Sequence, residues 1–303
     1  MRYFILIIFI IFSCSNENKE NEAVCPKRIL FSSDSQSETG NLILYEMNDD
    51  GTNLKALTSD TLSFTGKGRW TKSKAYIFAE TEGDTIRMLT KEGTVIDFIN
   101  GFDPYPFFDD KRIIYSDSRY VLWVMDYHIS CNPFHSERLR YIHENMSGTW
   151  KTLAAHPFQG GFVFIGRKVK EDGVEKNYSV FAVDENWNYT MTLNDSISIS
   201  DFLKDIENYS AAYSPEGDRL FFHDKEKGTK WIYFHENAIK DYEFGLPEGE
   251  EIGSMAWSDD PDKLALNVSG NGKNKIYLYH ISSQKLEIFR EESEFQLNLL
   301  DYR

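Results

Sequence analysis

The sequence predicts an all-β fold, a six-bladed β-propeller of four-stranded antiparallel blades. Apolar runs of strand length alternate with clusters of Gly, Asp, Asn and Ser along almost the whole chain. These runs recur in units of roughly 40 to 50 residues with several short strands each, which is the pattern of a propeller. Aromatic residues make up 15% of the 303 residues, and aromatic side chains favour strands.

The chain begins with a signal peptide, which we place at residues 1–13. Arg2 precedes the unbroken apolar run 3–12. That run is too short to cross a bilayer, because a transmembrane helix needs about 20 residues. Ser13-Cys14 ends the run, and the chain then becomes polar. A small residue before Cys at this junction resembles the lipobox of bacterial lipoproteins.

The lipobox resemblance implies that Cys14 is diacylated and becomes the mature N-terminus. It implies a membrane partner through the N-terminal lipid and an extracytoplasmic place in a bacterial cell envelope, periplasmic or on the surface. The alternatives are an ordinary signal peptide or a buried strand. Residues 14–25 are polar and without apolar periodicity, so they predict the lipidated Cys and a flexible tether ahead of a propeller at 26–303.

The charge of the chain excludes one class of partner. The formal net charge is −15 and is spread along the sequence. Nucleic-acid binding needs a basic surface, and none is visible, so we expect no nucleic-acid partner. An anionic lipid surface would repel the domain too, which leaves the lipid as the expected membrane attachment.

Three cysteines are present. If Cys14 carries lipid, Cys25 and Cys131 remain, and outside the cytoplasm such a pair is a candidate disulfide. Two unrelated thiols are the alternative, because nothing in the sequence brings the two positions together.

The strands follow in six units, of which the first lacks one strand. No long stretch has the spacing of an amphipathic helix, and only residues 199–208 fit a helical turn or two. The predicted strands are 29–31, 42–45 and 54–57; 68–70, 75–79, 85–89 and 94–99; 105–108, 112–116, 120–125 and 138–142; 152–155, 161–165, 178–183 and 189–193; 210–213, 219–222, 230–234 and 241–244; 254–257, 263–267, 275–279 and 285–289.

The apolar run 295–300 is left over at the C-terminus. An open ring would expose unpaired N–H and C=O groups at its edges. We therefore predict that this run joins the first blade as its innermost strand and closes the ring.

The turns carry a family resemblance. Tyr213-Ser214-Pro215-Glu216-Gly217-Asp218-Arg219-Leu220 resembles the Trp-Ser-Pro-Asp-Gly repeat of TolB-type propellers. A second, looser copy is found at 257–264, and a close third copy at 45–53 with Leu57-Thr58. Pro and Gly set the turn dihedrals between the first two strands of a blade. TolB has an α/β domain before its propeller, whereas only a tether precedes the first strand here. The resemblance thus implies propeller repeats alone, without the role of TolB in envelope assembly.

No residue is assigned to catalysis or metal binding, and no cofactor is expected. His128, His135, His143 and His156 cluster around Cys131. Propeller lyases that cleave acidic sugars hold a metal with His around the central opening, and this cluster resembles such a site. The spacings match no zinc pattern, so a long loop in the third unit with scattered polar residues is the favoured interpretation.

Other polar motifs predict turns. Asn48 to Asn53 has oxygen ligands near a Gly but lacks the terminal Glu of a calcium loop. Residues 270–273 read as a hairpin loop, since they lack the second half of a phosphate loop. No Gly-x-Ser-x-Gly is present, and the acid pairs 109–110, 250–251 and 259–260 are interpreted as solvated turns.

The expected function is therefore a non-catalytic module that binds a protein, peptide or glycan at one face of the propeller. Trp150, Trp187 and Tyr105 are candidates for stacking on a sugar or peptide, with packing as the alternative. The alternative function is an enzyme acting on polysaccharide, either a metal-assisted lyase or a glycoside hydrolase. The side chains that line the central opening are expected to distinguish the two.

Overall fold

The described part of the chain comprises most of the predicted domain. The computed structural model describes residues 27–64, 67–107, 110–117, 122–128, 135–141, 149–158, 161–170, 173–174, 179–183, 189–192, 209–233, 236, 238–292 and 296–303. Side chains are described for residues 27–64, 67–107, 110–117, 123–127, 210–233, 236, 238–292 and 296–303. The predicted signal peptide, the tether and the helical turn at 199–208 lie outside these residues. Within the described part, no helix has the length and apolar character needed to cross a bilayer.

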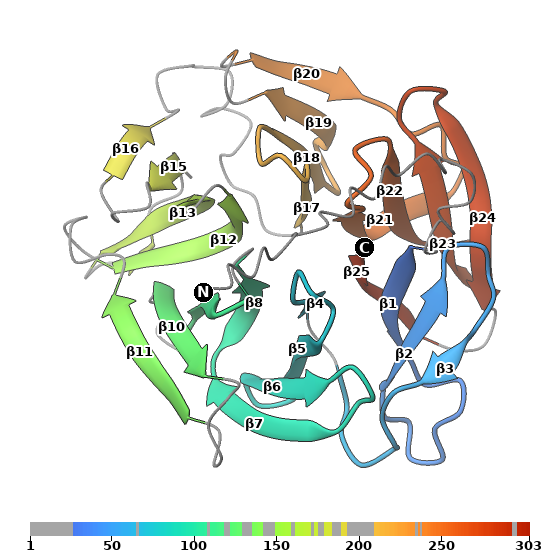
Figure 1. Ribbon diagram of the computed structural model, residues 1–303. Helices are drawn as coiled ribbons and strands as arrows, with labels where there is room; N and C mark the ends of the chain where they lie inside the picture. Colours follow the sequence, from blue (N-terminus) through green and yellow to red (C-terminus); the bar gives the residue numbers. More distant parts are fainter. Residues whose placement is uncertain are drawn as a thin grey trace, which may run out of the picture.

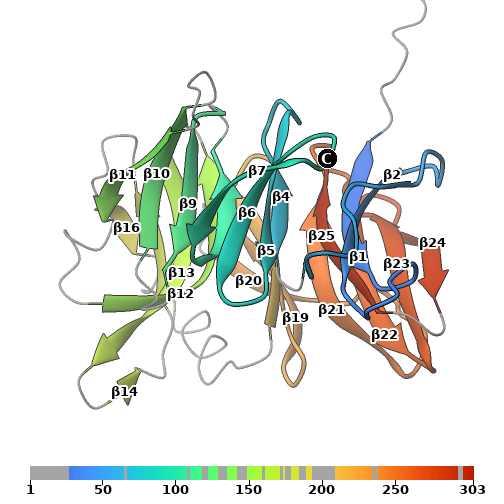
Figure 2. The same ribbon diagram turned by 90° about the horizontal axis from the view of Figure 1, so that it is seen from below.

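The described strands form a β-propeller, with antiparallel sheets arranged around an axis (Figure 1). Seen edge-on, the sheets stand side by side in a disc (Figure 2). From the innermost strand outwards, the first three sheets are β25 (Leu297–Tyr302), β1 (Arg28–Ser33), β2 (Ile43–Asn48) and β3 (Lys55–Ala56); β4 (Gly68–Trp70), β5 (Tyr76–Thr81), β6 (Thr85–Thr90) and β7 (Val95–Asn100); and β8 (Phe102–Pro106), β9 (Arg112–Ser116), β10 (Leu122–His128) and β11 (His135–Tyr141).

The remaining sheets follow the same order. They are β12 (Thr149–Phe158), β13 (Gly161–Lys170), β15 (Ser179–Val183) and β16 (Tyr189–Thr192), with β14 (Gly173–Val174) beside β13; β17 (Tyr209–Tyr213), β18 (Arg219–Asp224), β19 (Gly228–Tyr233) and β20 (Ala238–Tyr242); and β21 (Glu250–Trp257), β22 (Lys263–Gly270), β23 (Lys273–His280) and β24 (Lys285–Glu292).

The prediction of four-stranded antiparallel blades is confirmed for five of these sheets. It is wrong for the sheet of β12 to β16, which has a fifth strand, β14. The reason is the length of β13. Its first half pairs with β15, and Val169 and Lys170 extend beyond that partner and pair with β14 instead.

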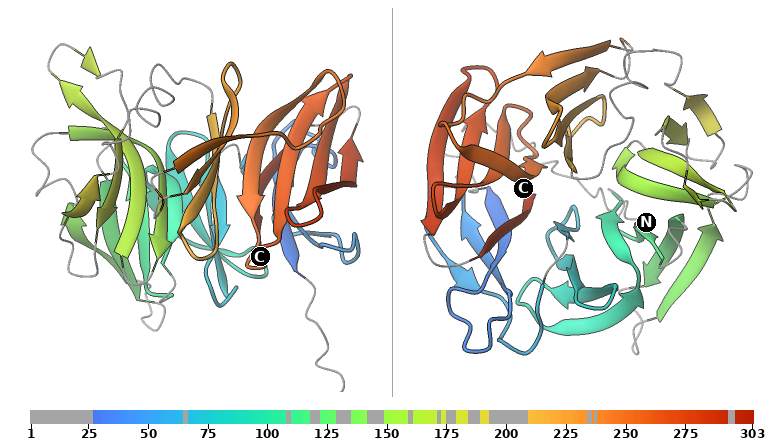
Figure 3. Two further views of the ribbon diagram at one scale, coloured as in Figure 1. Left: turned by 90° about the horizontal axis from the view of Figure 1, so that it is seen from above. Right: turned by 180° about the vertical axis from the view of Figure 1, so that it is seen from behind.

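The C-terminal strand joins the first sheet, as predicted from the leftover apolar run. β25 pairs antiparallel with β1, from Ile29 opposite Tyr302 to Ser33 opposite Leu297. The backbones of Arg28 and Arg303 exchange two hydrogen bonds, one of 2.8 Å. Figure 3 shows β25 beside β1 on the inner side of the ring. The strand runs over Leu297–Tyr302 rather than 295–300, and Phe295 lies outside the described residues.

Two motifs interpreted as turns are confirmed as turns. In the Asn48 to Asn53 segment, the Asp50 carboxylate accepts hydrogen bonds from the backbone N–H and the hydroxyl of Thr52 at 2.9 and 2.6 Å. Asn271 and Gly272 form a two-residue hairpin turn with φ of 53° and 74°, the left-handed values that a type I′ turn requires.

The segment 45–53 does not join the first two strands of its blade. It spans the end of β2 and the turn to β3, and these are the third and fourth strands because β25 stands innermost. In the sheet of β4 to β7, the turn that does join the first two strands is Thr71 to Tyr76. The backbone N–H of Thr71 donates a hydrogen bond to the carbonyl of Tyr76 at 3.0 Å. The sequence analysis did not identify this copy, which lacks both Pro and Gly.

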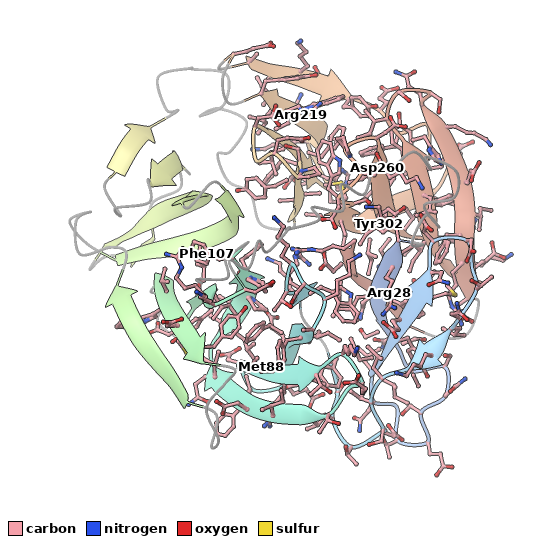
Figure 4. The ribbon with its side chains drawn as sticks, in the orientation of Figure 1. Arg28, Met88, Phe107, Arg219, Asp260 and Tyr302 are labelled. Carbon is pink, nitrogen blue, oxygen red and sulfur yellow. The ribbon has the colours of Figure 1, made fainter. Side chains whose placement is uncertain are left out.

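Aromatic side chains at the ends of the inner strands form a buried belt around the axis. Each stands at the last residue of an inner strand or directly after it, and each is at most 7% exposed. Figure 4 shows Tyr302 near the centre of the ring and Phe107 beside β8. Large flat rings fill the wedge between neighbouring blades, where apolar burial stabilises the fold. The members of the belt are Trp70, Phe107, Tyr213, Trp257 and Tyr302.

Candidate functional site

A pocket lies where the inner strands end, and we call it the central funnel. The inner strands β25, β4, β8, β17 and β21 and the turns after them contribute to it, so five sheets meet there. Its cavity volume is about 50 Å³. The described residues that line it are Arg69, Tyr105, Pro106, Ala211, Ala212, Tyr213, Pro215, Met255, Ala256, Trp257, Ser258, Asp259, Asp301 and Arg303.

The TolB-like turns form part of the rim of the central funnel. The Ser214 hydroxyl donates to the Asp218 carboxylate at 2.7 Å and accepts from the Arg219 backbone N–H at 3.1 Å. The Ser258 hydroxyl accepts from the Asp260 backbone N–H at 3.1 Å in the second copy. These bonds hold the turns by their Ser side chains and leave Pro215 and Asp259 facing the funnel.

A buried acid and two arginines occupy one side of the central funnel. Asp301 is 4% exposed, and its Oδ2 accepts the Trp70 backbone N–H at 2.8 Å and pairs with Arg303 Nε at 3.3 Å. Arg69 Nη1 donates to the carbonyl of Gly68 at 2.7 Å and to that of Leu300. The Arg69 guanidinium lies 5.5 Å from the ring centroid of Tyr105, in cation–π range.

The Asp301 carboxylate therefore already has hydrogen-bond partners, whereas the Arg69 guanidinium has N–H groups that donate to no described residue. A guanidinium has five N–H groups, and the hydrogen bonds that Arg69 donates to described residues involve Nη1 alone. Among the described residues, no carboxylate pairs with Arg69, unlike Arg303. The arrangement can orient a polar group of a ligand.

The structure places the sequence-predicted site residues unevenly. Tyr105 is 7% exposed, so its ring is packed in the core, and it also lines the central funnel. Cys14, Cys25, Cys131, His143 and Trp187 lie outside the described residues, and the side chains of His128, His135, His156 and Trp150 do too. Among the side chains that are described, no group of three or more His, Cys, Asp or Glu is placed to hold a metal ion.

The interpretation of the acid pairs as solvated turns is wrong for Glu250. This residue begins β21, and its side chain is 1% exposed. Its carboxylate accepts hydrogen bonds from Lys275 Nζ at 2.5 Å and from the Tyr277 hydroxyl at 2.8 Å. The ammonium group of Lys275 and the buried phenol of Tyr277, on the same sheet, are what allow the charge of Glu250 to be buried.

A second titratable cluster lies outside the central funnel. Burial, and after it the nearby Asp103 carboxylate, raises the pKa of Glu80 to about 6. Its two oxygens accept the backbone N–H groups of Asp103 and of Lys67, the latter at 3.0 Å, and Lys67 also pairs with Asp103. Because these contacts tie β5 to the start of β8, the cluster is a clamp between two blades.

A wider recess of about 400 Å³ lies between the sheets of β17–β20 and β21–β24. Tyr242, Phe244 and Ile252 form its apolar part. The lysine at its rim, Lys225, is paired with Glu251 at 2.6 Å. The recess therefore offers less for recognising a charged ligand than the central funnel does.

Sequence reasoning missed Arg69, Asp301 and Arg303. Asp301 and its partner Trp70 are 231 positions apart in the chain. None of the three missed residues belongs to a sequence motif. The only signal was indirect: the prediction that the C-terminal run closes the ring places 301–303 next to the strand 68–70.

No protein-family model matches this sequence, and no curated protein matches it. Solved structures do. TolB from Acinetobacter baumannii matches with a TM-score of 0.60 and 14% identity over 91% of this chain and 67% of that one. A protein assigned to TolB from Agrobacterium tumefaciens gives 0.58 and 11%, over 92% and 99%. A chain of a nidogen/laminin complex gives 0.58 and 12%, over 91% and 97%. The chain thus has a TolB-like β-propeller fold, and identities this low show the fold alone.

Proposed function

We propose that this protein is a non-catalytic binding module, a six-bladed propeller that holds a protein, peptide or glycan at its central funnel. One observation supports the proposal most. Five inner strands converge on a pocket whose described wall combines aromatic rings with an arginine that has no acid partner there. Concave sites with apolar walls and a few fixed polar groups are the usual form of ligand sites. Loops from several blades then surround whatever enters.

The proposal includes a lipid anchor at Cys14 and an extracytoplasmic location in a bacterial envelope. Its support is the sequence alone, an apolar run of signal-peptide length that ends at Ser13-Cys14. The tether 15–25 then gives the propeller reach away from the membrane.

The lipid anchor predicts the fate of Cys14. We expect the mature protein to begin at Cys14 with a diacylglyceryl group and to fractionate with membranes. Cys14→Ser is expected to abolish incorporation of radiolabelled palmitate and to release the protein from the membrane fraction. Cys131→Ser is the matched control, with labelling unchanged. A mature N-terminus other than Cys14, found by mass spectrometry, would refute the anchor.

Blocking the central funnel is expected to abolish ligand binding. Ala211 is a small, partly exposed residue of the wall, so Ala211→Phe adds a ring where a ligand would enter. Full-length protein in detergent is screened on an array of immobilised peptides and oligosaccharides. Ala211→Phe is expected to weaken binding to the selected probes at least tenfold.

The matched control is Ile288→Phe, which adds the same ring on the outer strand β24, where Ile288 is 58% exposed. It is expected to bind as wild type does. If no probe binds, or if both variants bind equally well, the central funnel is not the binding site.

A further inference from the structure

The charges at the central funnel run against those of the whole chain. The chain carries a formal charge of −15, yet Arg69 and Arg303 both line this pocket. Of the two lining acids, Asp301 is buried and already bonded to Trp70 and Arg303, and Asp259 is an exposed rim residue. Because Arg303 is paired with Asp301, the inner wall presents one cation, Arg69, that has no acid partner among the described residues.

Further cations gather at the same face. Lys74 is half-buried in the turn after β4. Its pKa is lowered mainly by burial, and the nearby charges of Lys27, Arg28 and Arg303 lower it too, against the opposing effect of Asp259. Arg28 and Arg303 are each paired with an acid, Glu46 and Asp301, so their positive charges are partly neutralised. The charge of Lys74 adds to the positive potential near the funnel.

Arg69 is positioned before any ligand arrives. The carbonyls of Gly68 and Leu300 fix Nη1, and the ring of Tyr105 lies under the guanidinium at 5.5 Å. The N–H groups on Nε and Nη2 remain, and they are arranged as a fork. A fork of this kind matches the two oxygens of a carboxylate, and a guanidinium that is already oriented loses little entropy on binding.

The size of the cavity restricts what can enter. A volume of about 50 Å³ holds roughly three to five waters at the ~10–15 Å³ that each needs. A carboxylate with its carbon has three heavy atoms and fits that space. A whole sugar ring or side chain does not, and it would remain at the mouth against Pro215 and Trp257.

We propose that the central funnel recognises its ligands by a carboxylate group, bound in a fork by Arg69 with Arg303 beside it. The proposal deepens the proposed function and rests on it. The carboxylate belongs either to a peptide, at its C-terminus or a side chain, or to an acidic sugar. In both sources the carboxylate is attached to a sugar ring or an apolar side chain, which would contact the rim residues Pro215 and Trp257.

The test uses two matched pairs of small probes and full-length protein. The peptide pair is N-acetylphenylalanine and its amide, and the sugar pair is galacturonate and galactose. Isothermal titration is expected to give a dissociation constant at least tenfold lower for the acid than for the neutral member of at least one pair. The pair that discriminates identifies the source. Binding of the acid is also expected to weaken between 50 and 500 mM NaCl, since ions screen the attraction.

Variants of Arg69 connect the effect to this residue. Arg69→Gln is expected to remove the preference for the acid. Arg69→Lys keeps the charge without the fork and is expected to give an intermediate loss, at an unchanged melting temperature. Arg87→Gln is the control, because Arg87 also packs on a ring, Phe98 at 5.3 Å, but does not line the central funnel.

Equal affinity for both members of each pair, or binding that survives Arg69→Gln, overturns the carboxylate proposal. It leaves the binding module intact if array probes still depend on Ala211. Absence of binding by both acids, together with array probes that ignore Ala211→Phe, overturns both proposals.

Discussion

Deletion of residues 297–303 is expected to leave a chain that does not fold to a stable ring. These residues form β25 and the C-terminus, and β25 is the innermost strand of the first blade. Leu297, Leu299, Leu300 and Tyr302 are between 0% and 6% exposed. Buried side chains of this size contribute about 1.5–3 kcal/mol each, so the four together supply roughly 6–12 kcal/mol. A whole domain is stable by only about 5–15 kcal/mol.

The deletion also removes polar partners. The Trp70 backbone N–H loses the Asp301 carboxylate, and β1 loses the strand that pairs with its inner edge. An unpaired inner edge invites pairing with other chains. Size-exclusion chromatography is therefore expected to show aggregates, and circular dichroism to show no cooperative melting.

Adding a synthetic peptide of residues 296–303 is expected to restore part of the cooperative transition. The control is Ile288→Ser on the outer strand β24, which removes an apolar side chain that is exposed. It is expected to change the free energy of unfolding by no more than about 0.5 kcal/mol. A deleted chain that stays monomeric and melts as wild type does would show that β25 is dispensable for closing the ring.

The closure by β25 also shows how much of the fold can be predicted from the sequence. Strand-length apolar runs with turn residues between them are local signals, so the strands of the propeller are predictable one by one. For example, the predicted strand 112–116 has the same bounds as the observed strand β9. The pairing of β25 with β1 is not local, and it was predictable only because a ring with a missing inner strand had one apolar run left over.

The candidate site was less predictable for the same physical reason. Tyr105 was identified because aromatic side chains are conspicuous in a sequence, and it does line the central funnel. Arg69 is one of many charged residues in strands. Only the approach of β25 to β4 gives it the carbonyl of Leu300 as a partner. Its role follows from a contact across the ring closure, which carries no pattern in the sequence.

The second large effect is expected from Phe221→Ala, at about 3–5 kcal/mol of lost stability. Phe221, on β18, is 0% exposed and touches four aromatic rings. Its ring centroid lies 4.6 Å from that of Trp231 and 4.8 Å from that of Tyr242. Phe244 and Trp257 follow at 5.2 and 5.1 Å. Truncation to Ala leaves a cavity between two blades that rigid neighbouring rings cannot fill.

The cavity is expected to reach the central funnel as well. Trp257 stacks on Phe221 at an interplanar angle of 28° and lines the pocket. The Arg219 guanidinium lies 5.7 Å from the centroid of the Trp257 ring and 6.0 Å from that of Trp231. If these two rings move into the cavity, Arg219 loses both cation–π contacts. Urea unfolding is expected to give a lower midpoint with an unchanged slope.

Phe98→Ala is the matched control for Phe221→Ala, since Phe98 stands on the outer strand β7 and is 55% exposed. It is expected to change the free energy of unfolding by no more than about 0.5–1 kcal/mol, the range for an exposed cation–π contact such as the one it makes with Arg87. Equal losses for the two variants would mean that the aromatic cluster does not join the two blades. A large loss for Phe221→Ala alone would place a main source of interblade stability next to the binding pocket, so that ligand binding at Trp257 should in turn stabilise the fold.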